Sequence, residues 1–416
     1  MKRMFSVFLV LMAISIVPTF AQAKRVGDIL VFNNWSADAE IGALNVIRKA
    51  FQAEGGTWND ITIAHDTGAS IPLINMLTGG NPPDVFIENN VTLRRQLLQQ
   101  GLLYDLTPLY NASGVDKYIA TGVKAAMTVD GKILSIPLGV QIVGSLFYNL
   151  KVAKQAGVDP KSWKSIDDMF ADFPKIRKAG FIPLALGAQK WQLEYLLGAL
   201  LAQVSGSTYD GIIGLNPTRA AIDTPELRQA LAIYRRMQQE ADPGSANRNW
   251  NDTTALVISG KALMQYHGDW MKGEFVAAKK KLGVDYDAMF LPGADGLVVT
   301  VDEETFLKPN NEIKKNTMDL LASIMLRKDI TEKFSAIKGA SPIRLDATAN
   351  ADKYTQLVLK VLGNPKIGHP VRNITMDPDY AGAFADAADA FWNTPSMTAD
   401  QFVAQLQKGY DQAFAK

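Results

Sequence analysis

Short apolar runs and helix-period segments alternate along the chain from about residue 28. Three apolar runs are typical of buried strands and cover residues 29–32, 61–64 and 84–87. Segments with an apolar residue every three or four positions predict three helices. The first covers residues 39–51, the second begins at about residue 70 and ends at Gly79-Gly80, and the third follows the strand 84–87 and ends near Gly101. Strands that alternate with crossover helices indicate a parallel sheet with helices on both faces.

A second alternating set follows residues 133–139, where Pro137 marks a segment that leaves the first set. Its predicted strands cover 146–148, 182–186 and 262–266, and its predicted helices cover 166–178, 191–204 and 225–241. Residues 287–290 and 298–301 predict strands that return toward the first set, and the chain after residue 344 is predominantly helical. We therefore expect two α/β lobes joined by hinge crossings, with a ligand cleft between them. The expected lobes are residues 24–137 with 298–338, and residues 138–297 with 339–416.

Polar and aromatic residues follow the first three predicted strands. They are Asn33-Asn34-Trp35, His65-Asp66 and Asn89-Asn90. Ligands of open α/β sheets bind beyond the carboxyl ends of the strands. These segments are therefore candidates for a binding site.

The first 23 residues have the organisation of a secretory signal peptide. Lys2 and Arg3 precede an apolar run over residues 5–20, and Ala21-Gln22-Ala23 fits the small-x-small cleavage pattern. The run is shorter than the roughly 20 residues that a membrane span needs, which disfavours the alternative of an uncleaved anchor. We expect export and a mature protein in the periplasm.

Composition limits the possible functions. The 416 residues are 47% hydrophobic and 20% charged, and the formal net charge is +1, so no global field favours nucleic acid or an anionic membrane. The chain contains no cysteine, which excludes thiolate catalysis and thiolate metal sites. It has no phosphate loop, dinucleotide fingerprint or paired-histidine zinc spacing. We expect neither cofactor nor metal.

Five sequence blocks resemble, in their order, the extracellular solute-binding proteins of carbohydrate ABC transporters (family 1), and among them the glucose/mannose-type sugar binders. The blocks are Asn34 to Glu40, Gly80 to Asp84, Ala179 to Gly187 with Trp191-Gln192, Met264 to Trp270 with Gly273-Glu274-Phe275, and Lys338-Gly339 before Pro342-Ile343-Arg344. The resemblance implies a two-lobe periplasmic-binding-protein fold that closes on a sugar. It also implies a membrane permease with a cytoplasmic ATPase as partners. The chain departs from the subgroup's pattern at Asn34, Asp38, Ala39, Gln141 and Ile74.

A pyranose has apolar faces and a rim of hydroxyls, so its binder needs aromatic rings beside groups that donate and accept hydrogen bonds. Trp35 is expected to supply a ring and Glu40 to engage hydroxyls, with core packing as the alternative for Trp35. His65 and Asp66 can contact hydroxyls or simply be solvated in a loop. Gln141 offers an amide in the hinge region.

The second lobe and the crossings supply the other candidates. Trp191 is expected to cover the second sugar face or to pack in the core. Asp269 can bind sugar or cap the next helix, and Trp270 can stack on sugar or pack between the lobes. Glu304 loosely resembles an acidic cleft position, with an exposed turn as its alternative. Lys338 can donate to hydroxyls or lie on the surface, and His369 falls where the subgroup has a cleft histidine.

Three functions fit these residues. We expect a monomeric, non-catalytic receptor that delivers a mono- or oligosaccharide to an ABC permease. An exported carbohydrate-active enzyme with paired carboxylates is the alternative, since Glu40, Asp66, Asp269 and Glu304 could supply a pair. The third is the same fold with other cargo, such as a sugar phosphate, which would call for clustered arginines, or a polyamine.

Overall fold

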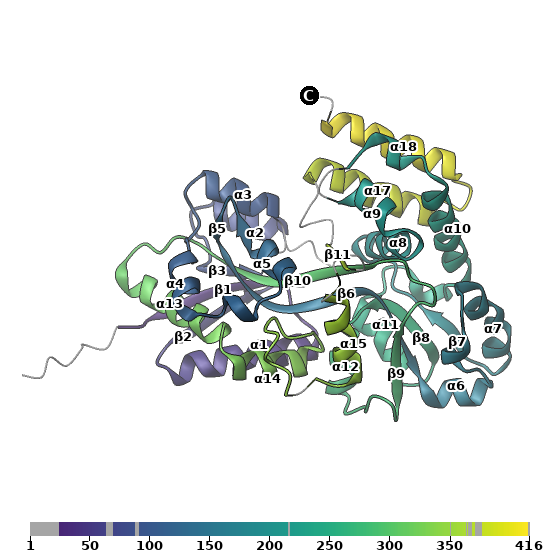
Figure 1. The fold of residues 1–416 in the computed structure, drawn as a ribbon, viewed down its shortest axis with the longest axis horizontal. Helices are drawn as coiled ribbons and strands as arrows, with labels where there is room; N and C mark the ends of the chain where they lie inside the picture. The colour runs from purple at the N-terminus through teal and green to yellow at the C-terminus, as the bar shows by residue number, and fades with distance from the viewer. Residues whose placement is uncertain are drawn as a thin grey trace, which may run out of the picture.

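Two bodies of α/β structure lie side by side in the computed structural model and share one sheet (Figure 1). The structure describes residues 25–63, 70–87, 91–214, 217–349, 351–362, 364, 368–370 and 377–414. The predicted signal peptide, residues 1–23, lies outside these ranges. Within them, no helix is both long enough and apolar enough to cross a membrane.

The first lobe contains three short strands covered by helices. Its strands are β1 (Asp28–Asn33), β2 (Thr57–Thr62) and β3 (Val85–Ile87). Its helices are α1 (Asp38–Ala53), α2 (Ser70–Thr78), α3 (Val91–Gln99), α4 (Thr107–Ser113), α5 (Thr121–Met127), α13 (Glu312–Met325) and α14 (Lys328–Lys338). A separate two-stranded ribbon pairs β4 (Thr128–Val129) with β5 (Lys132–Ile133).

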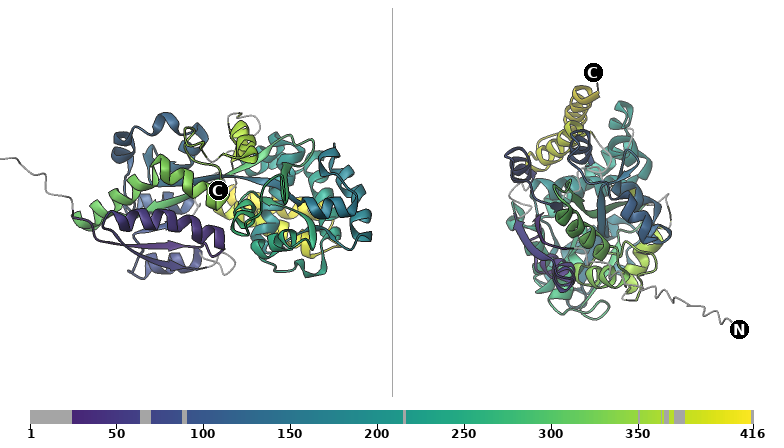
Figure 2. Two further views of the ribbon diagram at one scale, coloured as in Figure 1. Left: turned by 90° about the horizontal axis from the view of Figure 1, so that it is seen from below. Right: turned by 90° about the vertical axis from the view of Figure 1, so that its left-hand side faces the viewer.

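The second lobe is richer in helices. Its strands are β7 (Ile182–Ala185), β8 (Ala262–Gly268), β9 (Tyr286–Phe290) and β11 (Gly368–Pro370). Its α-helices are α6 (Leu150–Ala156), α7 (Ile166–Lys178), α8 (Lys190–Val204), α9 (Gly206–Ile213), α10 (Pro225–Glu240), α11 (Trp250–Ile258), α12 (Met271–Ala277), α15 (Lys353–Leu362), α17 (Pro378–Asn393) and α18 (Ala399–Phe414). The last two stack as a pair at the outer side of this lobe (Figures 1 and 2).

Two long strands, β6 (Ser135–Asn149) and β10 (Leu297–Phe306), run through both lobes. The sheet has the order β2-β1-β3-β10-β6-β8-β7, with β11 beside β10 and β9 beside β6. Strand β1 is parallel to β2 and β3, and β7 is parallel to β8, as predicted for each lobe. The two long strands β6 and β10, in contrast, are antiparallel to each other and to their respective neighbours β8 and β3. The sheet is therefore mixed.

Each long strand contributes side chains to two hydrophobic cores. Ile136 and Leu138 of β6 pack in the core of the first lobe, whereas Val143 and Leu146 pack in a core of the second. The strand 146–148 predicted from sequence is the end of β6 rather than a separate element. Strand β2 begins four residues before its predicted position, because it is an edge strand with a mostly exposed polar face.

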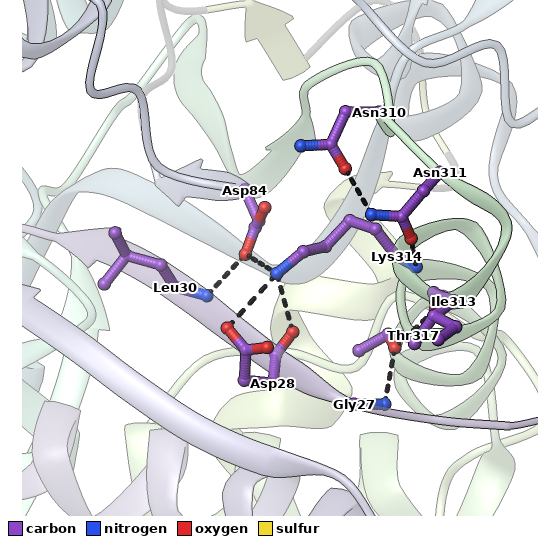
Figure 3. Close-up of polar contacts among 9 residues, drawn as sticks. All are labelled: Gly27, Asp28, Leu30, Asp84, Asn310, Asn311, Ile313, Lys314 and Thr317. Atoms are coloured by element: carbon purple, nitrogen blue, oxygen red, sulfur yellow. Dashed lines mark hydrogen bonds and ion pairs between the residues drawn. The ribbon is translucent and has the colours of Figure 1, made fainter.

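The amino ends of β1 and β3 are tied to helix α13 (Figure 3). The Lys314 ammonium lies 3.3 Å from a carboxylate oxygen of Asp28 and 2.8 Å from one of Asp84. The same Asp84 oxygen accepts a 2.7 Å hydrogen bond from the backbone N–H of Leu30. The backbone N–H of Gly27 donates to the Thr317 hydroxyl at 2.9 Å. These contacts anchor the strand ends opposite to the carboxyl ends that carry the candidate residues.

Candidate functional site

Lys338 brings together three acidic or aromatic residues from distant parts of the chain. It is the last residue of α14, is 2% exposed, and precedes Gly339 in a left-handed conformation that ends the helix. Its ammonium nitrogen lies 3.5 Å from Glu40 Oε1, 3.8 Å from Asp302 Oδ2 and 4.8 Å from the centroid of the Trp35 ring. The alternative of a surface lysine is therefore wrong.

Local hydrogen bonds fix the segment between β1 and α1. The buried Asn33 accepts from the backbone N–H of Trp35 at 3.1 Å and donates to the Thr62 hydroxyl at 3.1 Å. Glu40 Oε2 accepts from the backbone N–H groups of Ser36 and Ala37, both at 3.1 Å. One carboxylate oxygen of Glu40 thus holds the start of α1, and the other faces Lys338.

The Trp35 ring is largely covered. It is 6% exposed, its centroid is 6.0 Å from that of Phe334, and it belongs to the core of the first lobe. The Lys338 ammonium over the ring forms a cation–π contact. A stacking role of Trp35 on sugar stays a prediction.

A cluster of aromatic side chains in the second lobe forms the other half of the candidate site; we call it the aromatic cluster. It consists of Trp191 and Tyr195 on α8, Trp250 on α11, His267 on β8, and Trp270 just before α12. The Trp191 centroid lies 5.3 Å from that of His267 and 6.3 Å from that of Trp270. Tyr195 and Trp250 meet Trp270 edge-on at 6.2 and 6.5 Å. Trp191 and Tyr195 are half-buried, so their rings are the accessible members of the cluster.

Asp269 directly precedes Trp270 of the aromatic cluster in the sequence and interacts electrostatically with Lys338. Its backbone N–H donates to Ile142 O at 3.0 Å, and one of its carboxylate oxygens accepts from the Tyr354 hydroxyl at 3.5 Å. The alternative of a helix cap is wrong, because Trp270 occupies the N-cap position of α12 without any side-chain cap bond. Burial raises the pKa of Asp269 to about 8, although the nearby Lys272 and Lys338 lower it. At neutral pH this carboxyl group therefore carries a proton most of the time.

Several buried polar atoms near β6 and β8 have no hydrogen-bond partner within the described part of the chain. They are Gln141 Nε2, Tyr266 Oη, His267 Nε2, Asp269 Oδ1 and Trp270 Nε1. Gln141 lies on β6 opposite Thr300, and two residues further along β6 Val143 lies opposite Gly268 of β8. Burial lowers the pKa of His267 to about 3, so its imidazole is neutral and can donate or accept. Unpaired buried polar groups are costly, and a polar ligand or water would satisfy them.

The remaining predicted residues are not joined to this site by a described contact. Glu304 is fully buried on β10 opposite Ile87 and Ile136, which makes the alternative of an exposed turn wrong. Burial raises its pKa to about 8. The backbone of His369 lies in β11 opposite Val298. His65 and Asp66 lie outside the described residues. In the ranges that are described, no cluster of three histidine or acidic side chains could hold a metal ion.

Sequence reasoning missed Asp302, Tyr195 and Trp250. Tyr195 was detectable in principle, because it follows Trp191 by four residues on the same helix face. Asp302 belongs to the acidic run Asp302-Glu303-Glu304, in which a register shift between Asp302 and Glu303 breaks the alternation that assigns side chains to faces. Trp250 carries no comparable signal.

Comparisons with known proteins agree with this architecture. The model of the bacterial extracellular solute-binding protein family matches residues 37–305. A probable sugar-binding periplasmic protein of Mesorhizobium japonicum is 29% identical over 402 residues, which are 94% of this chain and 95% of that protein. The xylose/arabinose-binding protein XacG of Haloferax volcanii is 24% identical and covers 91% of this chain and 84% of its own length.

Solved structures show the same fold. A chitin oligosaccharide binding protein aligns with a TM-score of 0.79 at 18% identity, over 94% of this chain and 99% of its own. The bacterial solute receptor AcbH, described as exclusive for β-D-galactopyranose, aligns with a TM-score of 0.78 at 18% identity and the same coverage. These likenesses confirm the predicted two-lobe fold.

Proposed function

Because the chain belongs to the family of bacterial extracellular solute-binding proteins, we propose that it captures a mono- or oligosaccharide and delivers it to the permease of an ABC transporter. The signal-peptide pattern of residues 1–23 supports action in the periplasm. We extend the proposal to a monomeric mature protein.

The aromatic cluster beside unpartnered polar atoms is the observation that carries this proposal. Trp191 and Tyr195 offer accessible rings, and Gln141 Nε2 and Trp270 Nε1 are buried donors with no partner in the ranges that the structure covers. Rings for apolar faces, with donors and acceptors for hydroxyls, are what a pyranose requires. The sugar-binding names of the relatives point the same way.

The glucose/mannose-type subgroup remains part of the proposal rather than a finding. Support comes from Trp35, Glu40 and Lys338, which the subgroup's blocks contain and which the structure brings together. Gln141 replaces the subgroup's cleft histidine. An amide presents a donor and an acceptor at fixed positions, so Gln141 would alter which hydroxyl pattern is preferred. Trp35, His65, Asp66, Glu304 and His369 stay proposed site residues.

A receptor needs no reaction step, and none is proposed. Asp269 and Glu304 have pKa values of about 8 because they are buried, which does not require a catalytic role. The matching family and relatives are solute-binding and sugar-binding proteins, which favours the receptor over the enzyme alternative.

Titration of the mature protein with a panel of solutes tests the proposal. The panel contains D-glucose, D-galactose, D-xylose, L-arabinose, maltose and chitobiose, with glucose 6-phosphate and putrescine as other cargo, and binding is followed by tryptophan fluorescence and calorimetry. Saturable binding of at least one sugar without any product supports the receptor. Binding of only putrescine or the phosphate, or release of free sugar from a disaccharide, would overturn it.

Substitution of Trp191 tests the aromatic cluster directly. Trp191→Leu removes a half-buried ring and should weaken binding of the preferred sugar by about tenfold, whereas Trp191→Phe should retain much of the affinity. Trp58→Phe on the edge strand β2 is the matched control, because Trp58 packs edge-on against Phe51 in the core of the first lobe and is not part of the aromatic cluster. Equal affinities for the Leu variant and the wild type would contradict a role of the cluster in binding.

A further inference from the structure

Two short sequence blocks that were recognised only by resemblance lie against each other in space. They are Gly273-Glu274 at the start of α12 and Lys338-Gly339 at the end of α14. A Cβ atom placed at Gly273 would lie 2.5 Å from the carbonyl oxygen of Lys338 and 2.6 Å from the Cβ of Ala39. A Cβ atom at Gly339, where φ is +83°, would lie 2.3 Å from the backbone nitrogen of Gly273. Only glycine allows these backbones to approach so closely.

Glu274 adds a hydrogen bond at the same place. Its Oε1 accepts from the backbone N–H of Ala39 at 3.3 Å, in the first turn of the 16-residue helix α1. The first N–H groups of a helix have no partner inside the helix, so an external carboxylate stabilises them. Burial raises the pKa of Glu274, the Ala39 N–H lowers it, Glu40 and Asp38 raise it, and Lys338 lowers it.

The contact joins different cores. Met271 and Phe275 of α12 pack with Ile142 and Phe147 in a core of the second lobe. Leu44 of α1 and Phe334 of α14 belong to the core of the first lobe. Figure 1 shows α1, α14 and α12 next to one another below the two long strands. The two glycines and Glu274 therefore lie at a junction between lobes.

We propose that Gly273, Glu274 and Gly339 form a latch that holds the two lobes in the arrangement seen here. They are positioning residues, because the latch fixes the start of α1, with Trp35 and Glu40, relative to Asp269 and Trp270 just before α12. Solute affinity of a two-lobe receptor is scaled by the fraction of molecules in the competent arrangement. The latch thus influences solute affinity although its residues belong neither to the aromatic cluster nor to the side chains around the Lys338 ammonium.

Single substitutions separate the two parts of the latch. Gly273→Ala places a methyl group into the Lys338 backbone and should lower the latched population about tenfold. Glu274→Ala removes the acceptor for Ala39 and should lower it several-fold. Glu274→Gln keeps an oxygen acceptor and should retain the wild-type population. Gly382→Ala is the matched control, because a Cβ at this exposed position of α17 meets no atom within 4 Å.

The absence of cysteine allows the lobe arrangement to be measured without a solute. Cysteines introduced at the exposed positions Gln52 on α1 and Lys178 on α7 carry spin labels, and pulsed electron resonance gives the distribution of distances between them. A second distance population in Gly273→Ala and Glu274→Ala, with wild-type distributions for Glu274→Gln and Gly382→Ala, is expected. Identical distributions in all five proteins would overturn the latch.

A folding control and the absence of sugar make the distance measurement interpretable. Thermal unfolding of each labelled variant verifies that it folds, and Glu274→Ala carries the test if Gly273→Ala does not. The distance measurement uses no sugar, so a result against the latch does not contradict the proposed sugar binding. Conversely, if no sugar of the panel binds, the distances still test the latch.

Discussion

Glu303 and Glu304 are neighbours on β10, but their carboxyl groups lie in different environments. Glu303 forms an ion pair with Arg94, and both side chains are fully buried. Glu304 is equally buried, but both of its carboxyl oxygens lack a hydrogen-bond partner among the residues described. Burial without a compensating cation raises the pKa of Glu304 to about 8. Near neutral pH the protonated form of Glu304 is therefore favoured.

This difference predicts that Glu304→Gln changes the free energy of unfolding by an amount that depends on pH. The unfolded chain releases the Glu304 proton near pH 4, but the folded chain retains it up to about pH 8. The contribution of Glu304 to the free energy of unfolding is therefore complete below pH 4 and is lost as the pH rises to 8. The glutamine variant lacks this loss. It should exceed the wild type in stability above pH 8 by more than about 1 kcal/mol, and the gap should shrink toward pH 5.

Urea unfolding at pH 5, 7 and 9 measures this gap. The control is Glu312→Gln, at an exposed position in the first turn of α13. A gap for Glu304→Gln that does not change with pH would show that the carboxyl group is already ionised in the folded protein.

Individual site residues were predictable where they belong to a sequence block that resembles a known family. Glu40 and Lys338 were found from the resemblance, and the structure places them 3.5 Å apart. That contact joins residues 298 positions apart, and no local pattern encodes it. Asp302 was missed because its position depends on a register shift, which is a property of the paired strands rather than of one segment.

Among the elements, helices were predicted more closely than the central strands. The predicted helix 166–178 coincides with α7, and β1 and β3 were placed to within one residue at each end. The strand β6 was not recognised as one element, because Pro137, Gly139 and Gly144 fall inside it and normally indicate breaks. Neighbouring strands on both sides hold β6 extended in spite of these residues.

The link between α3 and β10 predicts a large effect of Arg94→Met. Arg94 donates to Ser135 at 2.6 Å and forms the buried ion pair with Glu303. Removal of the guanidinium leaves the Glu303 carboxylate buried without its cation, which should lower the free energy of unfolding by about 3–5 kcal/mol. In Arg94→Met/Glu303→Leu both charges are gone, so the double variant should recover most of this loss. Urea unfolding of Arg94→Met, Glu303→Leu, the double variant and the wild type measures both the loss and its recovery.

The prediction is contradicted if the double variant has no higher free energy of unfolding than Arg94→Met. That result would show that packing of the Arg94 stem, rather than charge compensation, stabilises the attachment of α3. Glu303→Leu alone completes the cycle, because it leaves the guanidinium as the uncompensated buried charge.

At the scale of the whole molecule, the two lobes share strands rather than a flexible linker. Strand β6 contributes to the core of the first lobe through Ile136 and Leu138, and to the second lobe through Val143, Leu146 and Phe147. Strand β10 pairs with β6 along eight positions across this boundary. Unfolding of one lobe alone would cut both strands in the middle and expose backbone groups and core on both sides of the cut.

Shared strands therefore predict a single cooperative unfolding transition for a chain large enough to have two. Single cysteines at Gln52 and at Lys178, labelled with an environment-sensitive dye, report on the first and second lobe separately because the chain has no other thiol. The two urea midpoints should coincide with each other and with the loss of helical circular dichroism. A shift of either label to a separate midpoint would mean that β6 and β10 come apart at the lobe boundary before either core unfolds. Gly273→Ala should leave the midpoints coincident, because the latch joins the lobes outside the strands that they share.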